Sequence, residues 1–178
     1  SFESFQLALR PAPALSSEEV LACFALIELT SAAAYKASSR GWKPDAKKRE
    51  MREDEMQYLL DKAQSSPDTA AVTVSNPIEG FLSFMITVED DFPVVYIYEI
   101  HLLPHLRGLG VGKHLMSIPE VIGQKASMTK IMLTVFKSNS AAEEFYRSLG
   151  YVEDEYSPPP KKLRGGKVKM PSYIIMSK

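Results

Sequence analysis

The chain has 178 residues, of which 45% are hydrophobic and 24% charged, so it can bury one substantial core and is too short to favour two full domains. We expect one domain over residues 1–178. The formal net charge of -1 argues against a nucleic-acid-binding protein that works through a basic face. The single cysteine excludes an intrachain disulfide. We expect no membrane span, since no apolar run approaches the length of roughly 18 to 20 residues that is needed to cross a bilayer. We therefore expect a soluble protein of a reducing, intracellular compartment.

The N-terminal part of the chain predicts two helices. The segment Ser-Ser-Glu-Glu at 16–19 is typical of a capping box, and apolar residues follow it at near-helical spacing to about Ser38. Pro44 and Asp45 open a second, highly charged helix, which we expect to continue through Leu60 with its charges on a solvated face.

Strands dominate the middle of the chain. Three segments rich in β-branched and aromatic residues are separated by turn-forming residues, as in antiparallel hairpins. These predicted strands are Thr69–Ser75, Ile78–Glu89 and Val94–Leu103.

The C-terminal part alternates helices and strands. A helix over 110–126 contains Pro119, which we expect to kink or split it. The segment 157–171 is rich in Pro, Lys and Gly without apolar periodicity, which predicts a mobile loop whose charges are solvated. The other predicted elements are a buried strand over Lys130–Phe136, a helix over Ser138–Leu149 closed by Gly150, and strands over Tyr151–Glu155 and Ser172–Met176.

The segment Arg-Gly-Leu-Gly-Val-Gly-Lys at 107–113 lies between a predicted strand and a predicted helix. Three glycines in five residues let a backbone approach a ligand, and the amides of a helix start favour an anion. A Walker A loop does not fit, because Arg107 stands five residues before Gly112 and His114 follows Lys113. The dinucleotide fingerprint also fails. A glycine-rich turn without a ligand is the alternative.

The spacing Arg-x-x-Gly-x-Gly resembles the pyrophosphate loop of the GNAT acetyl-CoA-dependent N-acetyltransferases. The predicted order of elements, from Ser16 to the C-terminus, is also similar to that family. The resemblance implies an α/β (α+β) fold with a central mixed, mostly antiparallel twisted sheet flanked by helices. It also implies acetyl-CoA as co-substrate.

Three segments, at 40–51, 96–99 and 132–139, resemble the NatD family of GNAT enzymes. They read Arg-Gly-Trp-Lys with the following Lys-Lys-Arg-Glu-Met, Tyr-x-Tyr-Glu, and Met-Leu-Thr-Val-Phe-Lys-x-Asn. That family acetylates the free α-amine of histones 4 and 2A, which begin Ser-Gly-Arg-Gly, in nucleus and cytoplasm and without an obligatory auxiliary subunit. The resemblance implies histone tails as partners, with no direct nucleic-acid or membrane partner. The chain departs from the family pattern at Arg40, where a second tryptophan is expected.

The resemblance also implies a cofactor site. The backbone of Ile100, His101 and Leu102 would pair with the pantetheine arm, and Asn139 and Tyr146 would face the cofactor. The residues expected to hold the pyrophosphate are Arg107, Gly108, Leu109, Gly110, Val111, Gly112 and Lys113.

The catalytic residues implied are Glu99, as a base acting through water, and Tyr98, which would position the amine with Tyr96. On a strand both tyrosines share one face and Glu99 projects to the other, unless a bulge redirects it. Two interior tyrosines and a surface glutamate are the alternative. An α-amine has a pKa of about 7.7 to 8.0, against about 10.4 for lysine, so a modest base suffices.

Further residues are expected to bind the peptide. These are Tyr35 and Trp42 at the mouth, Thr134 and Tyr173 along the peptide, and Glu89, with Asp90 nearby, for the arginine at the third substrate position. A solvated hairpin turn explains Glu89 and its neighbours equally well.

Two other functions stay open, a GNAT enzyme for lysine or small amines and a non-catalytic acyl-CoA-binding module. The three histidines show no metal-ligand spacing, so we expect no metal.

Overall fold

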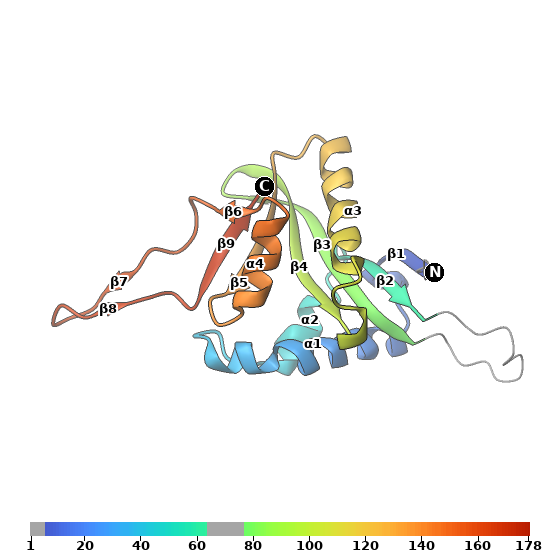
Figure 1. Cartoon of the computed structure of the whole chain (residues 1–178), viewed down its shortest axis with the longest axis horizontal. Coiled ribbons are helices and arrows are strands. Elements are labelled where there is room, and N and C mark those ends of the chain that lie inside the picture. Colours follow the sequence, from blue (N-terminus) through green and yellow to red (C-terminus); the bar gives the residue numbers. More distant parts are fainter. Residues whose placement is uncertain (1–5, 64–76) are drawn as a thin grey trace, which may run out of the picture. The chain divides into compact units, whose positions relative to one another are not determined.

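The computed structural model describes residues 6–63 and 77–178, so the strand predicted over 69–75 lies outside the described residues. Four helices are α1 (Ser17–Ala37), α2 (Pro44–Glu50), α3 (Val111–Lys125) and α4 (Ser140–Ser148) (Figure 1). The strands are β1 (Gln6–Pro11), β2 (Gln57–Lys62), β3 (Ile78–Glu89), β4 (Phe92–Leu102), β5 (Lys130–Phe136), β6 (Val152–Glu153), β7 (Lys161–Lys162), β8 (Val168–Lys169) and β9 (Tyr173–Ser177). Short 3-10 turns occupy Ala12–Ala14 and Pro104–Leu106.

Seven of these strands form one sheet in the order β1-β2-β3-β4-β5-β9-β6. β1 pairs with β2, β2 with β3, β5 with β9 and β6 with β9, all antiparallel, whereas β4 and β5 are parallel. Parallel neighbours need a crossover connection, which α3 supplies. The sheet is mixed and mostly antiparallel, as the sequence predicted.

The chain forms two compact units, each assembled from three segments. The described part of the first comes from residues 6–30, 43–63 with 77–85, and 98–118; the second comes from residues 31–42, 86–97 and 119–178. β3 and β4 each contribute residues to both units.

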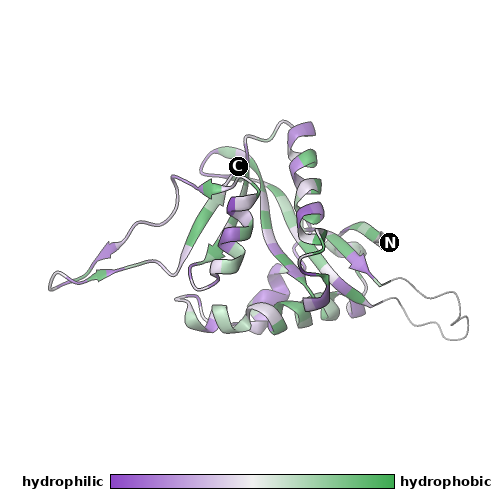
Figure 2. Cartoon of the chain, in the orientation of Figure 1, coloured by the Kyte–Doolittle hydropathy of each residue, from purple (hydrophilic) through white to green (hydrophobic). Residues whose placement is uncertain are grey.

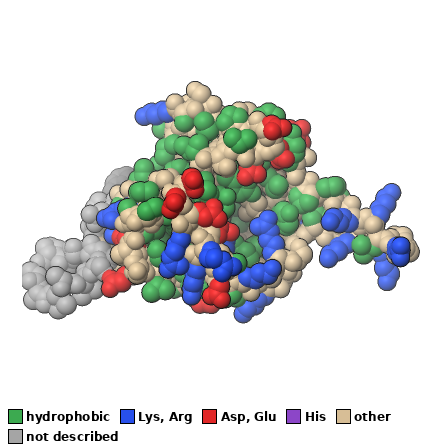
Figure 3. Space-filling view, turned by 180° about the vertical axis from the view of Figure 1, so that it is seen from behind, with side chains coloured by type: hydrophobic (Ala, Val, Ile, Leu, Met, Phe, Trp, Pro, Cys, Tyr) green, Lys and Arg blue, Asp and Glu red, His purple; other side chains and the backbone are tan. Residues whose placement is uncertain are grey.

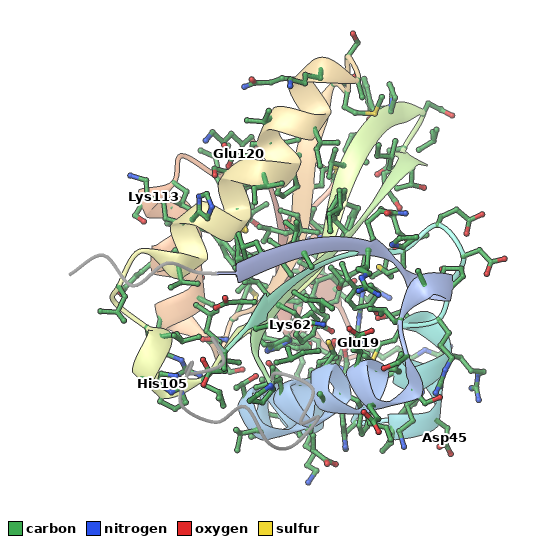
Figure 4. All side chains as sticks on the ribbon, turned by 90° about the vertical axis from the view of Figure 1, so that its right-hand side faces the viewer. Glu19, Asp45, Lys62, His105, Lys113 and Glu120 are labelled. Atoms are coloured by element: carbon green, nitrogen blue, oxygen red, sulfur yellow. The ribbon has the colours of Figure 1, made fainter. Side chains whose placement is uncertain are left out.

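Helix α1 begins with the predicted capping box. The Ser16 hydroxyl accepts the Glu19 amide hydrogen at 3.1 Å, and the Glu19 carboxylate accepts that of Ser16 at 2.9 Å. Glu19 also pairs with Lys62 of β2, with Nζ and Oε1 2.7 Å apart, so the helix start is tied to the sheet (Figure 4). Cys23 is fully buried, and its burial, with the negative charge of Glu19, raises the pKa of the thiol to about 12.

By length and composition alone, α1 is long and apolar enough to cross a membrane, so the expectation that no apolar run approaches that length is wrong. This is weak evidence for a membrane span, because core helices of soluble proteins pass the same test. Val20, Cys23, Phe24 and Ile27 are buried at helical spacing, whereas Leu21 and Leu29 are exposed. Figure 2 shows the hydropathy of each position along α1. The buried stripe is typical of a helix that packs on a core.

The second predicted helix is less than half as long as expected. α2 ends at Glu50, and Gln57–Lys62 form β2 instead of continuing the helix. Tyr58 and its three successors are all buried between β1 and β3, and the Tyr58 hydroxyl donates to the Met51 carbonyl at 2.7 Å. Pairing on both edges therefore outweighed the helical pattern that local residues suggested.

Helix α3 is not split by Pro119, which lies inside it. The missing amide removes one hydrogen bond, but Leu115, Met116 and Pro119 are buried along the same side of the helix. Gly123 brings α3 close to β5, since a Cβ there would lie 2.5 Å from Cδ1 of Ile131. Packing on the core therefore holds α3 together through its proline.

The predicted C-terminal loop contains regular structure. β7 and β8 pair as a two-stranded ribbon, with Lys161 opposite Lys169 and Lys162 opposite Val168. The segment 157–171, predicted as a mobile loop, thus contains a short ribbon. Every residue from Pro159 to Met170 is exposed, as expected of a solvated charge run.

Candidate active site

The glycine loop connects β4 to α3 in the first unit. Gly108 and Gly110 have φ of +77° and +86°, a backbone region that favours glycine, and buried Leu106 and Val111 anchor the two ends of the loop. The Arg107 guanidinium donates from Nε and one Nη to the Leu102 carbonyl, at 3.3 and 3.2 Å. The loop therefore has the backbone conformation that its glycines predicted.

The start of α3 presents backbone amides. Its first helical bond runs from His114 N to Gly110 O at 3.0 Å, so the amides of residues 111–113 have no partner within the helix. Lys113 is exposed on the first turn of α3 (Figure 4). Amides and an ammonium at a helix start fit a phosphate group.

The second half of β4 extends beyond its pairing with β5. The parallel register runs from Val94 opposite Lys130 to Ile97 opposite Leu133, whereas β4 continues to Leu102. The backbone of residues 100–102 thus lies past the last β5 partner, on a strand edge that an extended ligand can pair with.

A chain of polar contacts surrounds Glu99 in the first unit. Lys47 of α2 donates from Nζ to Glu99 Oε1 at 2.8 Å, and His101 Nε2 lies 2.6 Å from Glu99 Oε2. His101 Nδ1 lies 2.5 Å from the Thr30 hydroxyl oxygen, and that hydroxyl donates to the Leu26 carbonyl at 2.8 Å. His101 thus bridges the Glu99 carboxylate and the Thr30 hydroxyl through its two ring nitrogens. We call Thr30, Lys47, Glu99 and His101 the Glu99 array.

The Glu99 array is buried. Lys47 and Glu99 are each 8% exposed and His101 is 6% exposed, and Lys47 also pairs with Glu50. Glu99 therefore projects into the interior, on the face of β4 opposite to half-buried Tyr98. The prediction that the two side chains take opposite faces is confirmed. The alternative, in which Glu99 is a surface residue, is wrong.

His101 and Lys47 hold Glu99 as a carboxylate. Burial by itself raises its pKa, but the hydrogen bond and charge of His101, followed by the charge and hydrogen bond of Lys47, outweigh burial and lower the pKa to about 2. Glu99 is consequently a permanent negative charge at physiological pH and a weak proton acceptor.

The second unit contains an aromatic cluster. The ring of Tyr35 lies 5.4 Å from that of Trp42 and 4.9 Å from that of Phe136. The Tyr96 hydroxyl lies 2.5 Å from the Thr134 hydroxyl. Within this one unit, Tyr35 and Trp42 are therefore in ring contact, and Tyr96 and Thr134 are hydrogen-bonded. A substrate contact of these four residues stays a prediction.

Residues 26–151, well over half of the chain, match the Acetyltransferase (GNAT) family. The chain belongs to this family. Its fold and its acetyltransferase character follow from the membership, and this GNAT acetyltransferase resembles many proteins of known structure.

Among curated proteins, N-alpha-acetyltransferase 40 of Saccharomyces cerevisiae is 31% identical over an alignment of 117 residues, and the match covers 52% of this chain. The matched region spans 41% of that relative's length. The structure of the NatC complex bound to Gag peptide and CoA is similar over 97% of both chains, with 15% identity and a TM-score of 0.61. The PaiA N-acetyltransferase of Thermoplasma acidophilum, in complex with coenzyme A, is similar over 97% of this chain and 98% of its own, with 17% identity and a TM-score of 0.59. At these identities the structures establish the fold.

Several predicted residues of the GNAT acetyltransferase have structural partners. Asn139 caps α4 by accepting the Ala142 amide hydrogen at 3.2 Å, and Tyr146 is buried with its ring 6.2 Å from that of Tyr151. Glu89 ends β3, and Asp90 and Asp91 form the turn to β4 with φ of +48° and +68°. A cofactor or substrate contact of Asn139, Tyr146 and Glu89 stays a prediction.

Arg40 replaces the expected tryptophan and contacts an aromatic residue. Its guanidinium carbon lies 4.8 Å from the ring centroid of Tyr173, a cation–π distance. Tyr173 is thereby covered on one face by a cation instead of by a second aromatic ring.

Sequence reasoning missed Lys47, Thr30 and Phe136. Lys47 stands in a run of basic residues that read as a solvated helix face, and no local signal marks one lysine of such a run as buried. Phe136 was recognised as part of a strand but not as a partner of Tyr35. Within residues 6–63 and 77–178, no group of three or more His, Cys, Asp or Glu side chains is arranged to hold a metal ion.

Proposed function

We propose that this GNAT acetyltransferase transfers an acetyl group from acetyl-CoA to the free α-amine of histone tails that begin Ser-Gly-Arg-Gly, those of histones 4 and 2A. The observation that carries the proposal is the Glu99 array on β4, the strand that leads into the glycine loop. The 31% identity to N-alpha-acetyltransferase 40 over half the chain supports the choice of an α-amine.

Acetyl-CoA fits the described loop. The positive-φ glycines and the amides at the start of α3, together with Lys113, would hold its pyrophosphate. The backbone of residues 100–102, past the last β5 partner, would pair with the pantetheine arm. Asn139 and Tyr146 would contact the cofactor from the α4 side. Bound there, acetyl-CoA supplies an activated acetyl thioester.

The weak basicity of Glu99 selects for an amine that is already partly neutral. At pH 7.4 an α-amine is roughly a quarter neutral, whereas a lysine amine is roughly 0.1% neutral, a difference of about 300-fold. A carboxylate with a pKa of about 2 can orient a water and assist the first kind of amine, but is poorly matched to the second. The array thus favours α-amine over lysine substrates.

In the proposed reaction, the neutral α-amine attacks the acetyl carbon directly, and backbone amides stabilise the oxyanion. The carbon–sulfur bond then breaks, and CoA leaves as a thiolate that takes up a proton from solvent. Glu99 accepts the amine proton through water, and Tyr98 and Tyr96 position the amine. Tyr35, Trp42, Thr134 and Tyr173 would contact the peptide. Glu89 would pair with the substrate arginine at position three. We further propose action in nucleus and cytoplasm without an obligatory auxiliary subunit.

The test is to incubate the protein with acetyl-CoA and the peptide Ser-Gly-Arg-Gly-Lys and to locate the acetyl group by fragmentation mass spectrometry. We expect the α-amine to be acetylated, with kcat reduced roughly 100-fold in Glu99→Gln and KM raised by a substrate arginine-to-alanine change. The matched control is the same peptide with a blocked α-amine, which leaves lysine as its only amine. Acetylation of that control would indicate a lysine or small-amine enzyme, and cofactor binding without turnover would indicate an acyl-CoA-binding module.

A further inference from the structure

The β7–β8 ribbon is a regular hairpin. The Leu163 amide donates to the Lys167 carbonyl at 2.7 Å, and Gly165 and Gly166 turn the chain with φ of +84° and +78°. Prolines at 158–160 and at 171 stiffen the two arms that join the ribbon to β6 and β9. The ribbon is therefore a regular, projecting element (Figure 1).

The ribbon concentrates positive charge in a chain whose formal net charge is -1. It carries five cations, and residues 156–178 contain no Asp or Glu. The cations are Lys161, Lys162, Arg164, Lys167 and Lys169, and Figure 3 shows blue side chains gathered on this projection. Within the described ranges, none of them forms an ion pair with a carboxylate. These five exposed charges are therefore open to an anionic partner.

The register places like charges opposite each other. Lys161 and Lys169 are cross-strand partners, so their side chains share one face at neighbouring positions. Like charges directly opposite destabilise a strand pair, and this exposed ribbon has no core of its own to compensate. An anion bound between the two lysines removes that repulsion.

The base of the ribbon adds a further cation. The hydroxyl of Ser172 accepts the Ser39 amide hydrogen at 3.3 Å, which fixes the ribbon arm beside Arg40. Arg40 lies over the neighbouring ring of Tyr173. Positive charge thus continues from the ribbon to the C-terminal end of α1.

We propose that the β7–β8 ribbon binds duplex DNA through its phosphodiester backbone, with the ribbon lying along the major groove. A two-stranded β-ribbon fits the major groove of B-form DNA, whereas the major groove of A-form RNA is too narrow for it. The proposal differs from the expectation that the chain has no direct nucleic-acid partner, and it stands independently of the proposed acetylation reaction.

Two other occupants fit less well. A lid over the proposed histone tail would bring this basic ribbon against a basic peptide, with like-charge repulsion. An anionic membrane presents its phosphates to one face of the ribbon only, whereas Lys162 lies on one face and Lys161 and Lys169 lie on the other. Both faces therefore carry cations, as a binder surrounded by groove phosphates requires.

The test measures fluorescence anisotropy of a labelled DNA duplex with the whole protein. We expect log K to fall with log salt with a slope of about -4 to -5, or roughly 500-fold weaker binding as salt rises from about 50 to about 200 mM. Replacing all five ribbon cations with glutamine abolishes binding, with an unchanged circular dichroism spectrum. Changing the four lysines to arginine keeps it.

The matched control removes five exposed cations elsewhere, at Lys36, Lys43, Arg49, Arg52 and Lys125. If this control weakens DNA binding as much as the ribbon variant does, net charge explains the result and the proposal is wrong. Equal binding of an RNA duplex, or binding of anionic vesicles without DNA binding, also overturns it. A raised peptide KM in the ribbon variant, with DNA affinity unchanged, would establish a peptide lid instead.

Discussion

Replacing Lys47 with methionine tests whether the Glu99 array is a buried, charge-balanced unit. The change keeps the length and apolar character of the side chain but leaves Glu99, 8% exposed, to rely on His101 as its cationic neighbour in the array. We expect the free energy of unfolding at neutral pH to fall substantially, because a buried charge loses a partner.

The magnitude follows from burial and charge. Removing one partner of a buried ion pair costs about 3 to 5 kcal/mol, and we expect the lower end, about 3 kcal/mol, because His101 stays bonded to the other carboxylate oxygen. The lowering of the Glu99 pKa from 4.5 to about 2 corresponds to roughly 3 kcal/mol in favour of the carboxylate, which is the same order.

The assay is urea unfolding of Lys47→Met, Glu99→Gln and the double variant. The double variant should lose at least about 2 kcal/mol less than the two single losses together, because a neutral amide at position 99 no longer needs the lysine. Lys43→Met, at an exposed lysine, should change stability by less than about 0.5 kcal/mol. Glu50→Gln, at a side chain that is 33% exposed, should cost no more than about 1 kcal/mol. Additive losses in the double variant would refute the idea of a coupled buried array.

Three further outcomes are expected. The folded pKa of Glu99 is depressed from 4.5 to about 2, so its contribution of roughly 3 kcal/mol to stability is present above pH 4.5 and lost as pH falls towards 2. The unfolding free energy of Glu99→Gln, measured by urea titration, should therefore depend less steeply on pH in acid than that of the unchanged protein. Equal pH dependence of the two proteins would contradict this. Gly110 has φ of +86°, so Gly110→Ala should lower stability by roughly 1 to 2 kcal/mol through backbone strain and should raise the KM for acetyl-CoA. An unchanged melting temperature would show that the loop tolerates a side chain at this position. Asn139→Ala should cost about 1 kcal/mol by removing the cap of α4, whereas Asn139→Asp should retain it, as thermal melts of the two variants would show.

Local signals in the sequence predicted most elements well. The strands Ile78–Glu89 and Lys130–Phe136 have the predicted bounds, and the capping box at 16–19 forms both of its hydrogen bonds. Each of these depends on residues adjacent in the chain, through alternation or through a side chain that bonds three positions away. The glycine loop is also a feature that local residues predict, since the positive φ of Gly108 and Gly110 is a conformation that glycine favours.

Features that depend on distant residues were not predictable. Gln57–Lys62 became a strand because β1 and β3 pair with it on both edges, and neither partner is visible in the local pattern. Lys47 meets Glu99 across 52 positions of sequence, so the array that sets the charge state of Glu99 emerges only in the folded chain. The two-stranded ribbon was hidden because each of its strands has only two residues.

The buried thiol of Cys23 gives this protein an internal reporter of local opening. Because the side chain is fully buried and its pKa is raised to about 12, an alkylating reagent at neutral pH meets almost no thiolate in the folded state. The rate of alkylation therefore measures how often α1 lifts from the residues that it covers. As the sequence contains no second cysteine, the modification is confined to Cys23 and needs no engineered label.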